Sequence, residues 1–292
     1  KLEALGQNGT LIRKDGKTFL QLDCENAKEL SMKWGEKLYP FTKTGKKWIL
    51  ELPFSTAVNY VQICVDGQEV LSPDLPIAHG YCRPYNYIEL PDEEGLFELR
   101  DVPHGTLTQE FYKSKISDNW EKLIVYLPPC VPSAGLPVLY LQHGFGESEI
   151  SWSTTGKVNF LMDNLIAAGK IKPFAIVMGN GMVKQRIDGE LKLNRALYGQ
   201  MLVEEILPMI EKKYQFGGSK EKRGMAGLSM GSVQTTRTIC AHPELFSEVG
   251  IFSGFLRDRI VGDEEHDGIV PKSGGQSYLK AMDDAAFNTY FH

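Results

Sequence analysis

The pentapeptide Gly227-Leu228-Ser229-Met230-Gly231 constrains this chain more than any other part of its sequence. Residues 223–228 end in small and apolar side chains, as in a buried strand, and residues 232–241 have the composition of a helix. A serine on the sharp turn between such elements needs very small residues two positions before and after it, because the backbone is strained and the helix packs closely. The pattern therefore predicts a nucleophile elbow with Ser229 at its tip. The alternative is a glycine-lined turn beneath an open α/β sheet.

The composition narrows the classes of partner. With 292 residues, of which 42% are hydrophobic, the chain is long enough for two domains with real cores. Its formal net charge of −5 argues against nucleic acid or an anionic membrane surface as the main partner. No apolar run approaches the ~18 residues of a membrane span.

The five cysteines are scattered through the sequence without the spacing of metal ligands. No phosphate-loop pattern occurs either, so we expect neither a metal nor an organic cofactor. Cys64 in a strand-like run and Cys240 in a helical run suit buried free thiols. A disulfide from Cys82 to Cys24 or to Cys64 is the alternative.

Up to about residue 100 the sequence is typical of an all-β domain. Strand-like runs recur at roughly ten-residue spacing, at 18–22, 30–34, 47–52, 60–65 and 68–71. Asp66-Gly67 between the last two is a strong hairpin signal. We predict a small β-sandwich here. Residues 71–103, with five prolines and no clear period, are expected to form an ordered connector wrapped on the second domain.

From about residue 107 strand-like and helical runs alternate, the pattern of a parallel α/β sheet. The predicted strands are 120–127, 137–142, 174–178, 223–228 and 249–253, and the predicted helices are 158–168, 201–214 and 232–241. Pro208 inside the second helix predicts a modest kink.

An ester-cleaving serine needs two amide donors for the oxygen that becomes negative in the tetrahedral intermediate. Met230, the residue after the serine, supplies the first. The glycine-rich end of the stretch 139–146, which follows a buried strand, is expected to aim the amide of Phe145 as the second. An ordinary strand-end turn is the alternative.

Several segments together resemble the esterases of carbohydrate esterase family 1. The matching stretches are His143-Gly-Phe-Gly-Glu-Ser148 within 139–164, then 173–180, 204–214, 223–234 and Phe252-Ser253-Gly254. That family includes feruloyl and acetyl xylan esterases, and it is related to enterochelin esterase and S-formylglutathione hydrolase, which are esterase D-like α/β-hydrolases. Residues 18–74 resemble the immunoglobulin-like carbohydrate-binding module of family 48, which precedes the hydrolase in many bacterial feruloyl esterases.

The resemblance implies an α/β-hydrolase with a small N-terminal all-β sandwich domain. Residues 1–100 would form the immunoglobulin-like module and its connector, and residues 101–292 the esterase domain. The family's triad runs in the order Ser, Asp, His, with the acid and the base on loops after two further strands. The sequence stops before those strands, so we expect the domain to be incomplete at its C-terminus and both residues to lie beyond residue 292.

Local substitutes for the missing base are weaker candidates. His143 fits a residue that orients the oxyanion loop, and His242 fits a helix cap. His266 lies in a charged loop, and His292 is the last residue. Among carboxylates, nothing separates Asp258, Asp263 and Asp267 from other surface residues.

Two further residues are candidates for substrate binding. Trp152, just after the oxyanion loop, is a candidate wall of the acyl slot, or it packs beneath that loop. Gln234, one turn past Ser229, is placed to bond a substrate hydroxyl, although a plain helix-surface position is simpler. In the β-rich part Trp34, Trp48, Tyr60, Tyr85 and Tyr87 are candidates for sugar stacking or for the core.

The resulting hypothesis is a serine esterase that hydrolyses feruloyl or acetyl esters on plant xylan through an acyl-enzyme. Its expected partner is an ester-decorated plant polysaccharide or a hydroxycinnamoyl-oligosaccharide, which implies secretion or a periplasmic location. The alternatives are an enterochelin-type siderophore esterase and a catalytically silent carbohydrate-binding protein on the same scaffold.

Overall fold

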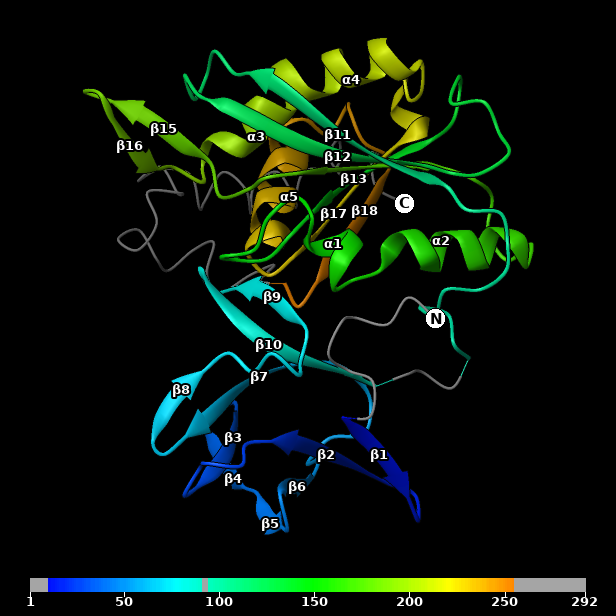
Figure 1. The fold of residues 1–292 in the computed structure, drawn as a ribbon. Coiled ribbons are helices and arrows are strands. Elements are labelled where there is room, and N and C mark those ends of the chain that lie inside the picture. Colours follow the sequence, from blue (N-terminus) through cyan, green and yellow to red (C-terminus); the bar gives the residue numbers. More distant parts are fainter. Residues whose placement is uncertain (1–9, 91–93, 255–292) are drawn as a thin grey trace. The chain divides into compact units, whose positions relative to one another are not determined.

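The computed structural model describes residues 10–90 and 94–254. The chain divides into two compact units, Lys1–Asp101 and Val102–His292, which are shown in Figure 1. Each unit has its own apolar core.

The first unit consists of two antiparallel sheets that share one core. One sheet has the order β1 (Leu11–Lys14), β2 (Lys17–Asp23), β6 (Lys47–Glu51), β5 (Thr42–Thr44). The other has the order β4 (Lys37–Pro40), β3 (Leu30–Trp34), β7 (Ala57–Val65), β10 (Arg83–Leu90), β9 (Ile77–Gly80), and β8 (Gln68–Val70) also pairs with β7. Leu20 and Leu50 of the first sheet pack with Met32 and Ile63 of the second. The predicted hairpin at Asp66-Gly67 is present between β7 and β8.

Residues 71–103 are not the connector that the sequence predicted, because β9 and β10 belong to the sheet of the first unit. Pro84 is tolerated in β10 because it lies opposite His79 of β9, before β10 begins to pair with β7 at Asn86. Buried Asn86 accepts the backbone N–H of Ser72 and donates to the carbonyls of Ser72 and Leu75. The proline-rich loop before β9 is therefore held by one side chain.

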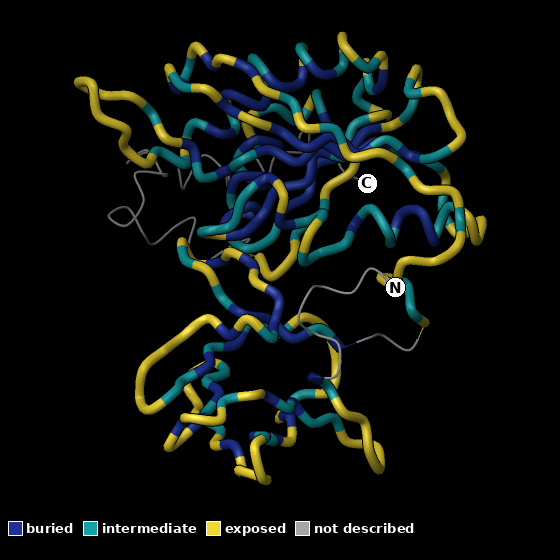
Figure 2. The backbone as a smooth tube through the Cα atoms, in the orientation of Figure 1, coloured by how far each residue is buried: buried dark blue, intermediate teal, exposed yellow. Residues whose placement is uncertain are grey.

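The second unit is built on a sheet that, in the described part of the chain, has six strands. Their order is β11 (Thr106–Lys113), β12 (Trp120–Leu127), β14 (Ala175–Gly179), β13 (Val138–Gln142), β17 (Arg223–Leu228), β18 (Glu248–Phe252). β12 is antiparallel to both of its neighbours, and β14, β13, β17 and β18 are mutually parallel. The middle strands form the buried centre of the unit in Figure 2. β11 was not predicted from the sequence, and its residues are mostly exposed.

Apolar clusters cover both faces of this sheet. Along β12, Leu123 and Val125 join one cluster, and Ile124 and Tyr126 join the other, as the two-residue period of a strand requires. The helices are α1 (Ser151–Thr154), α2 (Val158–Ala167), α3 (Leu197–Met201), a π-helix (Leu202–Ile206), α4 (Leu207–Tyr214), a 3-10 turn (Lys220–Lys222) and α5 (Met230–Ala241). The helix predicted at 201–214 is thus three consecutive pieces.

Pro208 explains why the long helix changes its winding. Proline has no N–H to donate and its ring crowds the carbonyl four residues earlier. The chain relieves this with the π-helix directly before α4, in which the N–H of Leu207 reaches back to the carbonyl of Leu202. The predicted kink is therefore a local widening of the helix.

A nearly buried ion pair joins α4 to the start of β17. Glu211 accepts from Nε of Arg223 at 2.7 Å and from its Nη2 at 2.8 Å, and the two side chains are 9% and 11% exposed. The hydroxyl of Tyr140 and the N–H of Gly218 also donate to Glu211. The hydrogen bonds with Glu211 raise the pKa of Arg223.

We expect Glu211→Gln to lower the free energy of unfolding by about 3 kcal/mol, because it leaves a buried guanidinium without its counter-charge. The matched control is Lys113→Ala, which removes an exposed ion pair with Asp118 in the same unit and is expected to cost less than about 1 kcal/mol. Urea unfolding of both variants measures the difference, and equal losses would contradict the assigned role of Glu211.

Candidate active site

Ser229 stands on the sharp turn between β17 and α5. Its φ of 52° and ψ of −110° are strained for a residue with a side chain. Four hydrogen bonds hold this turn. The N–H of Ser229 donates to the carbonyl of Phe252 at 2.9 Å, and the carbonyl of Ser229 accepts the N–H and the hydroxyl of Ser232 and the N–H of Val233. The hydroxyl of Ser229 is half-buried and makes no hydrogen bond to any residue of the described ranges.

Gly227 and Gly231 are required by close packing. A Cβ on Gly227 would lie 2.2 Å from the carbonyl oxygen of Gly231. A Cβ on Gly231 would lie 2.6 Å from the carbonyl oxygen of His143 and 2.7 Å from that of Gln142. The first turn of α5 therefore lies directly against the end of β13. The strand, turn and helix predicted around Ser229 are all present.

The predicted oxyanion loop is a β-turn at the end of β13. The N–H of Glu147 donates to the carbonyl of Gly144 at 3.3 Å, and Gly146 has a φ of 75° at the third position, where such a turn favours glycine. The amide of Gly144 is bound to the carboxylate of Glu147, and that of Gly146 to the sulfur of Met182. The amide of Phe145, between them, has no acceptor within the described residues.

The two amides expected to stabilise an oxyanion belong to segments that follow two adjacent strands. Gln142 pairs with Gly227 at the ends of the adjacent parallel strands β13 and β17, so the loops that follow emerge at the same edge of the sheet. Met230 begins α5, and the first amides of a helix have no acceptor in the helix. The site therefore offers free main-chain donors beside Ser229.

His143 is buried beneath this loop and uses both ring nitrogens. Nδ1 lies 2.8 Å from the carbonyl oxygen of Gly144, and Nε2 accepts the N–H of Gly181 at 2.9 Å. Burial lowers the pKa of the ring. With no nitrogen left for a substrate proton, His143 is not placed to act as a general base.

Trp152 lies between the end of β13 and Phe252 of β18. Its indole N–H donates to the carbonyl of Gln142 at 3.1 Å, and its ring meets that of Phe252 edge-on, with 6.0 Å between centroids. Phe252 is 45% exposed and pairs with Leu228 next to Ser229. Trp152 thus supports an exposed aromatic ring beside the serine.

Gln234 is buried, so the simple surface position that the sequence favoured is wrong. Only 5% of the residue is exposed, and its amide NH₂ donates at 3.0 Å to the carbonyls of Gly181 and Arg195. It therefore fastens the segment that follows β14 onto α5. Its role in binding substrate stays a prediction.

The other candidate bases are remote or lie outside the described residues. His242 caps the far end of the twelve-residue helix α5, roughly 18 Å from Ser229 at 1.5 Å per residue. His266, His292 and the carboxylates at 258, 263 and 267 lie outside the described residues. That the acid and base lie beyond residue 292 stays a prediction.

A histidine–carboxylate pair does occur in the unit, but at the wrong edge of the sheet. Nδ1 of His104 lies 2.9 Å from buried Asp163, which also accepts the hydroxyl of Tyr126 and the N–H of Gly105. Tyr126 pairs with Ile176 near the amino end of β14, whereas Ser229 follows the carboxyl end of β17. The pair ties the entry of β11 to α2.

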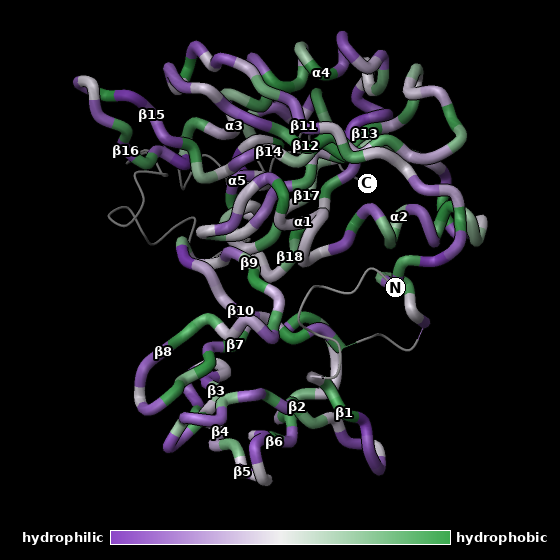
Figure 3. The backbone as a smooth tube through the Cα atoms, viewed as in Figure 1, coloured by the Kyte–Doolittle hydropathy of each residue, from purple (hydrophilic) through white to green (hydrophobic). Residues whose placement is uncertain are grey.

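The hairpin of β15 (Lys184–Ile187) and β16 (Glu190–Leu193) was not predicted, although Asp188-Gly189 is a hairpin signal. Hydrophilic and hydrophobic residues alternate along β16, whereas β15 begins with three hydrophilic residues (Figure 3). The hairpin follows β14 at the carboxyl edge of the sheet. Just after it, Arg195 places its guanidinium 4.9 Å from the ring centre of Phe145.

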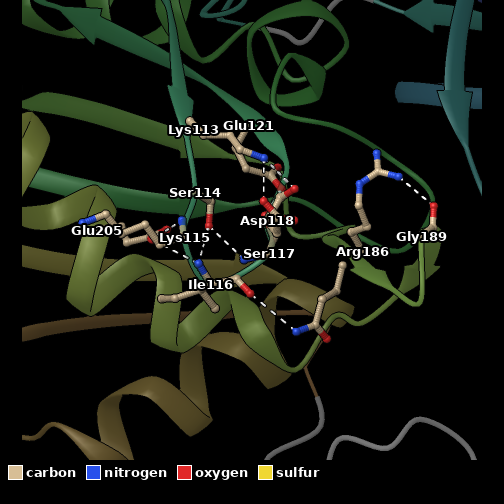
Figure 4. Close-up of polar contacts among 11 residues, drawn as sticks. Lys113, Ser114, Lys115, Ile116, Ser117, Asp118, Glu121, Arg186, Gly189 and Glu205 are labelled. Carbon is tan, nitrogen blue, oxygen red and sulfur yellow. Dashed lines mark hydrogen bonds and ion pairs between the residues drawn. The ribbon is translucent and has the colours of Figure 1, made fainter.

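The base of this hairpin is anchored to the loop between β11 and β12 (Figure 4). Gln185 donates to the carbonyl of Ile116, and the N–H of Arg186 donates to that of Ser117. From the other side, Glu205 accepts the N–H groups of Lys115 and Ile116. The carboxylate of Glu205 therefore holds this loop as well.

The aromatic candidates of the first unit separate into core and surface. Trp48 and Tyr87 are buried, and Trp34 packs against Phe54. Tyr60 and Tyr85 are only half-buried and stack on each other.

All five cysteines are free, so neither of the alternative disulfides forms. Cys64 and Cys240 are half-buried, and burial raises the pKa of Cys240 to about 11. Within residues 10–90 and 94–254, no group of three or more histidine, cysteine or acidic side chains is placed to hold a metal ion. No helix in those ranges is long and apolar enough to cross a membrane.

The second unit has an α/β-hydrolase-like fold with a serine at the turn where such enzymes carry their nucleophile, and a β-rich region precedes it. Residues 114–289 match the family of putative esterases. The chain belongs to this family of carboxylic ester hydrolases.

Individual proteins that are similar to this chain are also named as esterases. An endo-1,4-β-xylanase/feruloyl esterase of Xylanibacter ruminicola is 31% identical over 264 residues, which cover 85% of this chain and 36% of that protein. The chain thus spans about a third of the length of this relative. A ferulic acid esterase of known structure is 26% identical with a TM-score of 0.52, covering 64% of this chain and 76% of that one. The enterobactin esterase of Shigella flexneri shares the fold, with a TM-score of 0.64 at 12% identity over 94% of this chain and 79% of that one.

The close approach of α5 to β13 can be tested with two glycines. We expect Gly231→Ala to lower the free energy of unfolding by about 2 kcal/mol, because two backbone carbonyls occupy the space of its Cβ. A Cβ on Gly224 would first meet the flexible end of Leu139 at 3.3 Å, so Gly224→Ala should cost less than about 1 kcal/mol. Urea unfolding is the measurement. A Gly231→Ala variant as stable as the parent would show that α5 can move away.

Proposed function

We propose that this chain is the catalytic part of a serine esterase that removes feruloyl or acetyl groups from plant xylan. The observation that carries the proposal is the strained turn that presents Ser229 beside two loops with free amide donors. The family match and the naming of a relative as a xylanase/feruloyl esterase support the class of ester.

In the proposed mechanism the hydroxyl of Ser229 attacks the ester carbonyl and transfers its proton to a histidine base. The amides of Met230 and Phe145 bind the oxyanion of the tetrahedral intermediate. The sugar alcohol leaves with the proton from that histidine, and an acyl-enzyme remains. Water then attacks the acyl group by the same steps and releases the acid. We place the histidine and its aspartate outside the described residues, and no step uses a metal or an organic cofactor.

The aromatic acyl group needs an apolar surface beside Ser229. Phe252 and Phe145 are 45% and 37% exposed, and each belongs to an element next to the serine. We assign Trp152 to the same wall, because its ring supports that of Phe252. For Gln234 we propose an indirect role in substrate binding, in which it holds the carbonyls of Gly181 and Arg195, because its side-chain oxygen is itself buried.

A siderophore esterase is the second candidate, and Arg195 is the observation that favours it. Its guanidinium lies over the ring of Phe145, where it can attract an anionic catecholate. A carbohydrate-binding protein without catalysis is the third candidate, which predicts that Ser229 does not react.

We further propose that the first unit is an immunoglobulin-like module of the family 48 type and that the protein works outside the cytoplasm. The two sheets around one core support the first proposal. The location of plant-polymer substrates supports the second.

We expect Ser229→Ala in the protein that carries this chain to lower kcat for methyl ferulate by at least about 10³-fold, because no acyl-enzyme can form. The control is Ser247→Ala, a serine of the same unit whose hydroxyl donates to the carbonyl of Arg223, and it should retain full activity. A fluorophosphonate should add its mass to the parent and to the control, and not to Ser229→Ala.

Substrate ranking then separates the candidates. Faster hydrolysis of methyl ferulate or p-nitrophenyl acetate than of a catecholate triester supports the main proposal, and the reverse order supports the siderophore esterase. An unlabelled parent protein that still binds xylan would support the third candidate.

A further inference from the structure

The imidazole of His143 has one proton, and the structure assigns its place. Gly181 donates its backbone N–H to Nε2 at 2.9 Å, and a backbone amide can only donate. Nε2 therefore carries no proton. The proton of the neutral ring is on Nδ1, which donates it to the carbonyl of Gly144 at 2.8 Å. The residue is 1% exposed, and burial lowers its pKa, so the ring stays neutral near pH 7.

This hydrogen bond determines how the next peptide group is oriented. In a planar trans peptide the carbonyl of one residue and the N–H of the next point in opposite directions. Because the carbonyl of Gly144 faces the buried ring, the N–H of Phe145 points away from it. We propose that His143 is a positioning residue whose Nδ1–H aims the amide of Phe145 at the oxyanion. The inference rests on the proposed function, which assigns that amide to the oxyanion hole.

The other contacts of the loop hold it less directly. The N–H of Glu147 also reaches the carbonyl of Gly144, but at 3.3 Å. The carboxylate of Glu147 binds the amide of Gly144, which belongs to the preceding peptide group. The bond from His143 is thus the shorter of the two on the carbonyl whose direction matters.

The ring is itself held from the opposite side. Gly181, which donates to Nε2, has its own carbonyl bound by the amide of Gln234 on α5. The same helix begins with Met230, the other oxyanion donor. His143 therefore sets the second donor relative to the helix that supplies the first.

Two substitutions separate the roles of the two nitrogens. In the His143→Asn variant the side-chain amide lies as far from Cα as Nδ1 does in histidine. It can still donate to the carbonyl of Gly144, but it no longer accepts the N–H of Gly181. In His143→Gln the side-chain amide lies as far from Cα as Nε2 and can still accept the N–H of Gly181. The carbonyl of Gly144 then loses its side-chain donor and keeps only the longer bond from the N–H of Glu147. Each variant keeps one of the two hydrogen bonds, so each is the stability control for the other.

We expect His143→Asn to keep kcat for methyl ferulate within about 5-fold of the parent, and His143→Gln to lose about 100-fold, the effect of misplacing one oxyanion donor. KM should change by less than about 3-fold in both, because the lost interaction acts only in the transition state. Equal kcat values for the two variants, or losses of kcat that follow the melting temperature alone, would overturn the inference.

A spectroscopic measurement on the same protein needs no turnover. The ¹⁵N resonances that vanish in His143→Asn identify this ring, and we expect them to show a neutral imidazole with its proton on Nδ1 at pH 7. A proton on Nε2, or on both nitrogens, would overturn the inference. A parent protein whose Ser229 does not react with the fluorophosphonate would instead overturn the proposed function, whatever the tautomer.

Discussion

The candidate site depends on how closely the first turn of α5 approaches the end of β13. Gly227 and Gly231 have no side chains, so main chain lies against main chain where any Cβ would collide. This contact places Met230 at the start of the helix beside the loop that carries Phe145. It also imposes the strained backbone of Ser229, which the bonds with Phe252 and Ser232 hold in place. The proposed nucleophile, Ser229, and the proposed amide donors therefore depend on the same close contact of α5 with β13. A larger residue at Gly227 or Gly231 would break this contact.

Much of the fold follows from patterns that are local in the sequence. The strand at 120–127 was predicted with its observed bounds, because the continuous apolar run of residues 123–127 suits a strand with both faces covered. The elements that were not predicted correctly are those whose stability comes from contacts with residues far away in the sequence. β10 contains a proline that is harmless only because of its register with β9 and β7. The hairpin of β15 and β16 is short and mostly exposed, and it depends on the loop between β11 and β12.

The candidate site also has parts that could be predicted from the sequence and parts that could not. The strand, turn and helix around Ser229 could be predicted, because glycine spacing determines backbone geometry. The catalytic role of Ser229 and the oxyanion roles of Met230 and Phe145 stay predictions. Gln234 could not be placed from the sequence, since a glutamine on a helix normally faces solvent. It is buried because Gly181 leaves room: a Cβ there would lie 2.5 Å from its side-chain oxygen and 2.3 Å from the amide nitrogen of Gln142. The lack of a side chain at Gly181, which is distant in the sequence, therefore determines the position of the Gln234 side chain.

Main-chain donors stabilise the oxyanion of any ester alike, so substrate choice must come from the side chains around them. The segment between β14 and α3 supplies several: Met182 holds the amide of Gly146, and Arg195 lies over the ring of Phe145. Gln234 fixes both ends of that segment to α5, through Gly181 and Arg195. A change of length or sequence in this segment would reshape the rim without disturbing the elbow. Solved esterases named for ferulic acid and for enterobactin each share the fold of this chain, at 26% and 12% identity to it.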